Sequence, residues 1–101
     1  MPFKASFIFI CEETLPSRDK AVIANSAISL DVVGVSTYAQ AVTEAKRLYG
    51  EGVRAFELCA GFGTNGIAAV KKALPDDAVV GAVRFDLHPA LGYKSGDTAF
   101  A

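Results

Sequence analysis

The sequence contains no Trp, one His and two Cys, and it has no extended basic segment. Its 10 Lys and Arg are balanced by 11 Asp and Glu, and no basic run is longer than the pair Lys71-Lys72. Because binding to nucleic acid needs a basic stripe along the phosphate backbone, we expect no nucleic-acid partner. Two Cys without framework spacing argue against a disulfide scaffold and predict a location in the reducing cytoplasm.

Long apolar runs are also missing. The N-terminal apolar stretch extends only to Cys11, so it is too short for a transmembrane helix, and it lacks the small-residue cleavage pattern of a secretory signal. We therefore expect no membrane partner. The composition is that of a globular protein, because 51% of the 101 residues are hydrophobic. No linker divides the chain, which predicts a single domain over residues 1–101.

Apolar runs alternate with helix-like segments along the chain. Buried strands are predicted over residues 3–11, 28–35, 53–59 and 78–85. A short helix is predicted over residues 16–25. A second helix begins at a capping box, in which Thr37 accepts a hydrogen bond and Gln40 reaches back, and it would end with Gly50 in the left-handed conformation. A third helix precedes Pro75.

This β-α-β-α-β-α-β order predicts an α/β fold. The expected architecture is a small four-stranded parallel sheet with helices on both faces and the flavodoxin-like strand order 2-1-3-4. Right-handed connections leave only the short helix over residues 16–25 on one face, which is too small to cover four apolar strands. Either residues 86–101, which we expect to form an ordered tail or lid, or a second subunit must cover the remainder. We therefore predict a homo-oligomer.

A glycine-rich turn after the third strand is the central candidate site. Residues 61–66 match G-x-G-x-x-G, and Asp86 follows Gly66 by 20 residues, where dinucleotide-binding folds place the acid that binds ribose. That fingerprint normally opens a domain, however, and only 15 residues follow Asp86, so no dinucleotide cofactor is predicted.

The expected ligand of this turn is a small anionic metabolite. Its phosphate or carboxylate would be bound by backbone N–H groups at the start of the third helix. The residues concerned are Gly61, Phe62, Gly63, Thr64 and Asn65. The alternative is that the glycines only allow a tight turn between strand and helix.

Residues near this turn could add chemistry. Glu57 and Arg84 lie in neighbouring predicted strands, where an ion pair would neutralise two buried charges, and either could also serve a ligand as acid, base or anion anchor. Cys11 and Cys59 end adjacent predicted strands, either as small buried hydrophobes or as thiols beside the ligand.

His88 is the only His and follows the fourth strand on the ligand side. It is the candidate general acid or base, with Cys59, Glu57 or Asp86 as its partner. As a lone His it could equally have a structural role. No spacing such as C-x-x-C supports a metal site.

Two motifs carry a resemblance to a known family. They are Glu57-Leu58-Cys59-x-Gly61-Phe62-Gly63 and Val83-Arg84-Phe85-Asp86-x-His88-Pro89. With the glycine-containing tail, they resemble an uncharacterised family of small bacterial single-domain proteins, classed as a domain of unknown function. The resemblance covers nearly the whole chain and implies a cytosolic α/β domain, but it brings no established activity. More loosely, the chain resembles the βα units of TIM-barrel enzymes, of which four would make half a barrel.

Our leading hypothesis is a cytoplasmic, oligomeric domain that binds a small anionic metabolite at the carboxyl ends of the first, third and fourth strands. His88, Cys59 and Glu57 are the candidates for lyase-like or isomerase-like proton transfer. One alternative is a non-catalytic binding or assembly module. Another is a thiol or metal site built on Cys59 and His88.

Overall fold

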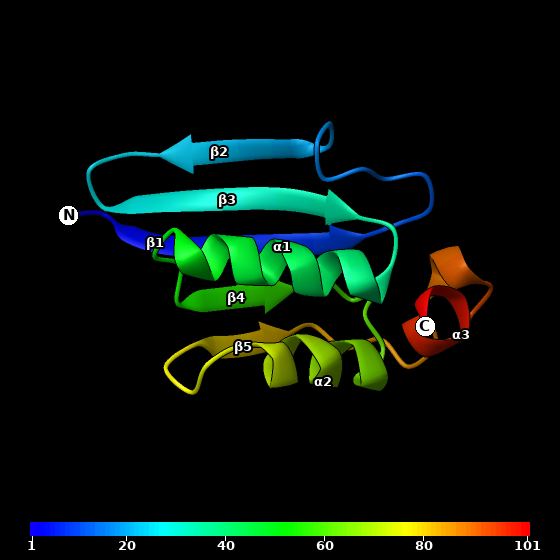
Figure 1. Cartoon of the computed structure of the whole chain (residues 1–101). Coiled ribbons are helices and arrows are strands. Elements are labelled where there is room, and N and C mark those ends of the chain that lie inside the picture. Colours follow the sequence, from blue (N-terminus) through cyan, green and yellow to red (C-terminus); the bar gives the residue numbers. More distant parts are fainter.

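Five strands form one mixed sheet in the order β2-β3-β1-β4-β5 (Figure 1). The computed structural model describes residues 1–101. Its elements are β1 (Phe3–Ile10), β2 (Lys20–Ala24), β3 (Ile28–Val35), α1 (Tyr38–Gly50), β4 (Ala55–Leu58), α2 (Thr64–Ala73), β5 (Val79–Ala82), a 3-10 helix η1 (Pro89–Leu91) and α3 (Gly96–Phe100). The strands β3, β1, β4 and β5 are parallel, and β2 pairs antiparallel with β3. No helix is long and apolar enough to cross a membrane.

The α/β class is confirmed, but the predicted four-stranded parallel sheet with flavodoxin-like order is wrong. The segment predicted as a helix over residues 16–25 contains a turn and strand β2 instead. Its Val22 and Ile23 are β-branched and pair with Asp31 and Leu30 of β3. The side chain of Asn25 accepts hydrogen bonds from the N–H groups of residues 27 and 28, which closes the turn between the two strands. Strand pairing therefore outweighs the local helical signal.

Helix α1 begins where the sequence predicts. Thr37 accepts a hydrogen bond from the Gln40 N–H at 3.1 Å, as expected for an N-cap. The Gln40 side chain does not complete the capping box at Thr37, because it accepts from the Ser36 N–H at 2.8 Å. Gly50 is the last helical residue, and the left-handed residue is Gly52, with φ of 104°. The helix therefore ends at the predicted residue, but the left-handed glycine lies two residues later than predicted.

Both long helices cover the same face of the sheet (Figure 1). The connections from β3 through α1 to β4 and from β4 through α2 to β5 cross the sheet in one direction, so right-handed crossovers put both helices on one side. The core of 16 buried hydrophobic residues lies between this face and the helices, with Ile8, Val35 and Phe56 facing Ala41 and Leu48. The prediction of helices on both faces is wrong, because β2 replaces the helix that would have covered the other side.

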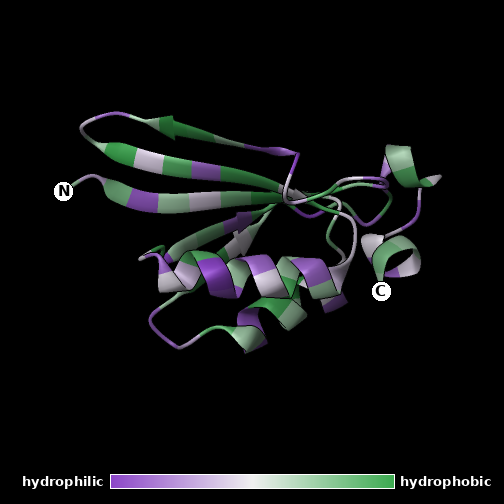
Figure 2. Cartoon of the chain, turned by 45° about the horizontal axis from the view of Figure 1, so that its top comes forward, coloured by the Kyte–Doolittle hydropathy of each residue, from purple (hydrophilic) through white to green (hydrophobic).

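The second face of the sheet has no helix over it, and we call it the open face. It carries the strand residues that alternate with the core positions: Phe3, Ala5, Phe7, Phe9, Ala21, Ile23, Ile28, Leu30, Val32, Gly34, Ala55, Glu57, Val79 and Gly81. None of them belongs to the core cluster. The strands β2 and β3 are coloured as hydrophobic along much of their length in Figure 2.

Residues 83–101 leave the sheet and fold over its carboxyl end. Strand β5 ends at Ala82, earlier than predicted, and the tail then forms η1 and α3 beside α2. Phe100 is only 5% exposed and joins the core, where its ring lies 6.5 Å from that of Tyr38. The tail is therefore an ordered part of the domain.

Candidate functional site

A small cavity lies at the carboxyl ends of β1 and β4, and we call it the carboxyl-end pocket. Its volume is about 190 Å³. It is lined by Ile10, Cys11, Glu12, Gly61, His88, Ala90, Leu91 and Phe100. The chain leaves β1 toward β2 and β3 but leaves β4 toward β5, so this crevice is the switch point at which open α/β sheets bind ligands. Cys11, Gly61 and His88, predicted as site residues from three separate segments, thus share one cavity.

Four larger hollows lie elsewhere: two beside Pro16, one along β4 and β5, and one of about 270 Å³ between β2, β3 and Arg47. The two near Pro16 have volumes of about 310 and 270 Å³ and are open surface grooves between the β1–β2 loop and α1. The third, about 260 Å³, lies along β4 and β5 on the open face and includes Glu57. None contains His88 or a Cys, so we place the candidate site in the smaller but more enclosed carboxyl-end pocket.

His88 is held in one orientation by the tail. Its Nδ1 accepts a hydrogen bond from the Ala90 N–H at 3.1 Å, which caps η1. A neutral ring that accepts at Nδ1 carries its proton at Nε2, so Nε2 is the donor left for a ligand. The backbone N–H of His88 donates to the Lys94 carbonyl at 3.0 Å, and the Phe85 ring packs edge-on at 5.3 Å.

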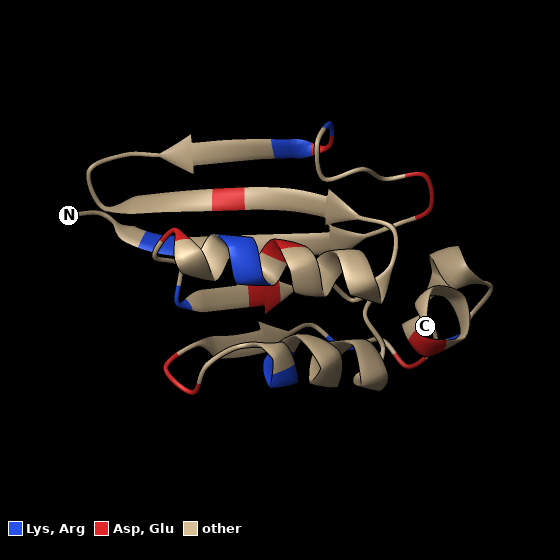
Figure 3. Cartoon of the chain, viewed as in Figure 1, with Lys and Arg blue, Asp and Glu red and all other residues tan.

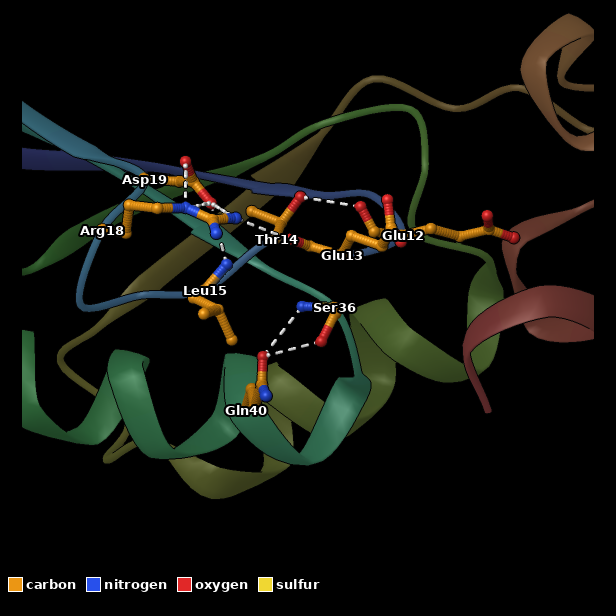
Figure 4. Close-up of polar contacts among 8 residues, drawn as sticks. All are labelled: Glu12, Glu13, Thr14, Leu15, Arg18, Asp19, Ser36 and Gln40. Carbon is orange, nitrogen blue, oxygen red and sulfur yellow. Dashed lines mark hydrogen bonds and ion pairs between the residues drawn. The ribbon is translucent and has the colours of Figure 1, made fainter.

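Glu12 lies at the pocket on a loop that is tightly hydrogen bonded (Figure 4). Arg18 donates to the Glu13 carbonyl at 2.7 Å and pairs with Asp19 at 2.8 Å. Asp19 in turn accepts from the Leu15 N–H at 2.9 Å. In Figure 4 the Glu12 side chain points away from this network toward the tail. The loop therefore holds a free carboxylate at the pocket.

The two Cys have different surroundings. Cys11 is exposed and lines the pocket, whereas Cys59 is half-buried beneath it. The Cys59 sulfur accepts hydrogen bonds from the N–H groups of Ile10 at 3.4 Å and Gly61 at 3.3 Å. Cys59 thus joins the end of β1 to the glycine turn, while Cys11 is the thiol that a ligand in the pocket can reach.

The glycine turn is closed by groups of the chain itself. The Gly61 and Phe62 N–H groups donate to Cys59, and the Gly63 N–H donates to the Tyr38 hydroxyl at 3.0 Å. The Asn65 N–H donates to the carboxylate of Asp97 at 3.0 Å. Four of the five predicted donors therefore already have an acceptor within the chain, and the carboxylate at this turn is the Asp97 side chain of α3 and not that of a ligand.

Asp97 acts as the cap that α2 does not have locally. Gly63 is the N-cap of α2 and has no side chain, so the first turn of the helix takes a carboxylate from 32 residues away. Tyr38 donates to the same carboxylate at 2.8 Å, and burial raises the pKa of Tyr38 to about 12. Burial acts to raise the pKa of Asp97 also, but the hydrogen bonds from Asn65, Tyr38 and Gly66 outweigh it and hold that pKa below its ordinary value.

Arg84 and Asp86 lie outside the pocket. Arg84 pairs with Asp86 at 2.8 Å and donates to the hydroxyl of Thr64. The predicted ion pair between Glu57 and Arg84 is wrong, because β5 ends at Ala82 and Glu57 lies opposite Gly81 on the open face. Glu57 lines the hollow on that face, so the predicted group of His88, Cys59 and Glu57 is not brought together.

No group of three or more His, Cys, Asp or Glu side chains is arranged to hold a metal ion. The carboxyl end of the sheet nevertheless carries several acidic residues, drawn in red in Figure 3. They are Glu12, Glu13, Asp86 and Asp97, against the basic Arg84 and Lys94. Arg84 is paired with Asp86, and Asp97 accepts a hydrogen bond from the Asn65 N–H. The acidic side chain that lines the pocket itself is Glu12.

A sequence model of a known family matches residues 3–98. The chain belongs to DUF6506, a family of unknown function. This confirms the part of the resemblance that assigns the chain, over nearly its whole length, to a domain of unknown function. No curated protein and no solved structure is significantly similar to this DUF6506 chain.

Sequence reasoning missed several residues that build the site of this DUF6506 chain. Leu91 and Phe100 form apolar walls of the pocket, and Asp97 closes the glycine turn. No local pattern could have found Asp97, because its partners lie more than 30 residues away. Glu12 did carry a signal, since it directly follows the first predicted strand at the ligand end of the sheet.

Proposed function

We propose that this protein binds a small metabolite in the carboxyl-end pocket. One observation carries the proposal: residues from the end of β1, the turn after β4 and the tail meet in one enclosed cavity at the switch point of the sheet. Three of them, Cys11, Gly61 and His88, are predicted from the sequence as site residues. The tail forms one wall of this cavity, which supports its predicted role as a lid.

The size and lining of the pocket limit the ligand. A volume of about 190 Å³ is room for about six water molecules, which is too little for a nucleotide. Leu91, Phe100 and Ile10 offer apolar contacts, while Glu12 and the Nε2–H of His88 offer an acceptor and a donor. A small amphipathic compound with an amine or hydroxyl group for Glu12 fits this lining best.

A small anion at the glycine turn is the second candidate. The binding of the Asp97 carboxylate by the Asn65 and Gly66 N–H groups supports it, because the same donors suit a ligand carboxylate or phosphate. Such an anion has to displace Asp97. The two candidates make different predictions, because only the second one requires Asp97 to leave the turn.

Proton transfer stays a prediction for this site. Glu12, rather than Glu57, is the carboxylate that shares a cavity with His88. An acid and a base in one small cavity are the minimum needed for lyase-like or isomerase-like chemistry. In the thiol alternative, Cys11 replaces Cys59, since the Cys59 sulfur is already hydrogen bonded to two backbone groups.

The test is a screen of small polar and amphipathic compounds by ¹H–¹⁵N NMR. We expect hits to shift the amide signals of Cys11, Gly61, His88 and Leu91. Ala90→Phe fills the pocket from an exposed position and should abolish these shifts, whereas Ala99→Phe, an exposed change on α3 outside the pocket, should retain them. Hits that bind Ala90→Phe as well as the native chain would contradict the proposal.

Inorganic phosphate tests the second candidate. If phosphate occupies the glycine turn, it should shift the amide signals of Asn65 and Gly66, and Asp97→Asn should strengthen its binding because the competing carboxylate is gone. Phosphate that shifts neither signal in the native chain or in Asp97→Asn rules out the anion site and leaves the pocket proposal unaffected.

A further inference from the structure

The strands of the sheet are apolar on both sides, but helices cover only one of them. In β1, Ile8 and Ile10 face the core, while Phe7 and Phe9 face the open side. Strands with one solvated face normally alternate apolar and polar residues, and continuous apolar strands are typical of sheets buried on both faces. The sequence of these strands therefore requires a second covering layer.

Strand pairing arranges the open face in rows that are apolar except at Glu57. One row crosses all five strands and consists of Ile23, Leu30, Ala5, Ala55 and Val79. The next row is Ala21, Val32, Phe7, Glu57 and Gly81. Of the charges on strands in Figure 3, only that of Glu57 lies at an open-face position, because Lys4, Lys20 and Asp31 fall on the helix side.

We infer that the open face is the interface of a homodimer, in which the sheets of two copies pack face to face. A second copy supplies a partner surface of the same apolar character and the same flat shape, as a two-fold symmetric interface requires. No open-face position of the strands carries Lys or Arg, which argues against an anionic membrane as the covering layer. The inference is independent of the carboxyl-end pocket, which lies beyond the ends of the strands.

The area of the face suits a dimer. Strands are about 4.8 Å apart and rise about 3.3 Å per residue, so the five strands give a flat footprint of about 450 Å² per subunit. The two footprints together approach the roughly 1,000 Å² that distinguishes specific interfaces from incidental contacts. Because side chains project from the sheet, the accessible surface that a dimer buries is larger than the flat footprint. A patch of this size matches the largest apolar patch that a monomer typically exposes, and such patches are often functional.

The longest strands place the centre of the interface on β1 and β3. Phe3, Phe7, Ile28, Leu30 and Val32 gather there, whereas the shorter strands β4 and β5 carry small residues and Glu57. With the two-fold axis near Leu30 on β3, Glu57 lies two strands away on β4 and lines a hollow of about 260 Å³. Its carboxylate can then remain hydrated, which avoids the cost of burying an unpaired charge.

Adjacent residues of β2 provide a matched test. Ile23 and Val22 are 59% and 60% exposed, but Ile23 lies on the open face and Val22 on the helix side. Sedimentation should give the native chain a mass twice its 10.6 kDa. Ile23→Glu should raise the dimer dissociation constant at least about 100-fold, since the change occurs once in each subunit and each buried charge costs at least about tenfold. Val22→Glu should leave the constant unchanged.

A second open-face variant excludes a purely local effect of strand β2. Phe3→Glu, at an exposed position of β1, should also give a folded monomer, as judged by circular dichroism. A native chain that sediments at 10.6 kDa at micromolar concentration overturns the inference, whether or not it binds lipid vesicles. A dimer that survives both Ile23→Glu and Phe3→Glu overturns it as well, because its interface then lies elsewhere.

Discussion

The two faces of the sheet are built from similar residues but have different surroundings. On the helix side, Val33, Val35 and Phe56 are fully buried under α1 and α2. On the open face, Phe3, Ile23 and Val79 are each more than half exposed. The apolar composition of the strands indicates how much of the sheet has to be buried. Which element supplies that burial depends on where the connections run.

The largest difference between the faces should appear when one Phe is removed from each. Phe56→Ala opens a cavity in the core and should lower the free energy of unfolding by about 3–5 kcal/mol. Phe3→Ala removes an exposed ring and should cost less than about 1 kcal/mol in dilute protein. Urea unfolding measures both. If the open face is an interface, the cost of Phe3→Ala grows with protein concentration, and equal costs in dilute protein would contradict the comparison.

Two glycines compare the packing of the tail against the glycine turn with the packing on the open face. A Cβ at Gly96 would overlap the carbonyl oxygen of Gly61, so Gly96→Ala should displace the tail and cost about 1–3 kcal/mol. Gly81 on the open face has no neighbour within 4 Å of such a Cβ, so Gly81→Ala should be neutral. Thermal unfolding compares the two, and the signal of Phe100 reports whether the tail has moved. A neutral Gly96→Ala would mean that the tail is loosely held.

The carboxylate that ties the tail to the helix side makes stability depend on pH. The folded pKa of Asp97 lies below its ordinary value of 3.8, so its stabilising effect is present above that value and is lost as the pH falls through the folded pKa. Asp97→Asn should cost about 1 kcal/mol near neutral pH, as for loss of a helix cap. Urea unfolding should find this difference shrinking below pH 3.8. A difference that is constant with pH would contradict the assignment.

The smallest effect is expected at Ser6, a polar residue of the covered face. Its hydroxyl is fully buried and has no hydrogen-bond partner. Ser6→Ala removes an unsatisfied group and should leave the free energy of unfolding unchanged or raise it by up to about 1 kcal/mol. Chemical unfolding is again the measurement, and Thr14→Ala, which removes a hydroxyl that is hydrogen bonded to the Glu12 carbonyl, is the control expected to destabilise. A clear loss at Ser6 would reveal an unrecognised partner.

Several features of the fold and the site were predictable because they depend on neighbouring residues. Strand β3 covers the predicted range 28–35, and the N-cap at Thr37 begins α1 as expected. Cys11 and Gly61 were expected at one edge of the sheet because they follow or end parallel strands, and they line the same pocket. The helix over residues 16–25 failed, because Val22 and Ile23 gain more from pairing with β3 than from a short isolated helix.

By itself, the sequence determined the α/β class, the family, the strand that leads into the glycine turn and the need to bury both sides of β1. Only the tertiary structure decided which groups meet. It placed Asp97 on the N–H groups of Asn65 and Gly66, put Glu12 rather than Glu57 in the same pocket as His88, and left one face of the sheet without a helix. The physical reason is range: caps and periodicity act over a few residues, whereas contacts across the sheet depend on strand order and connection handedness, which no local pattern encodes.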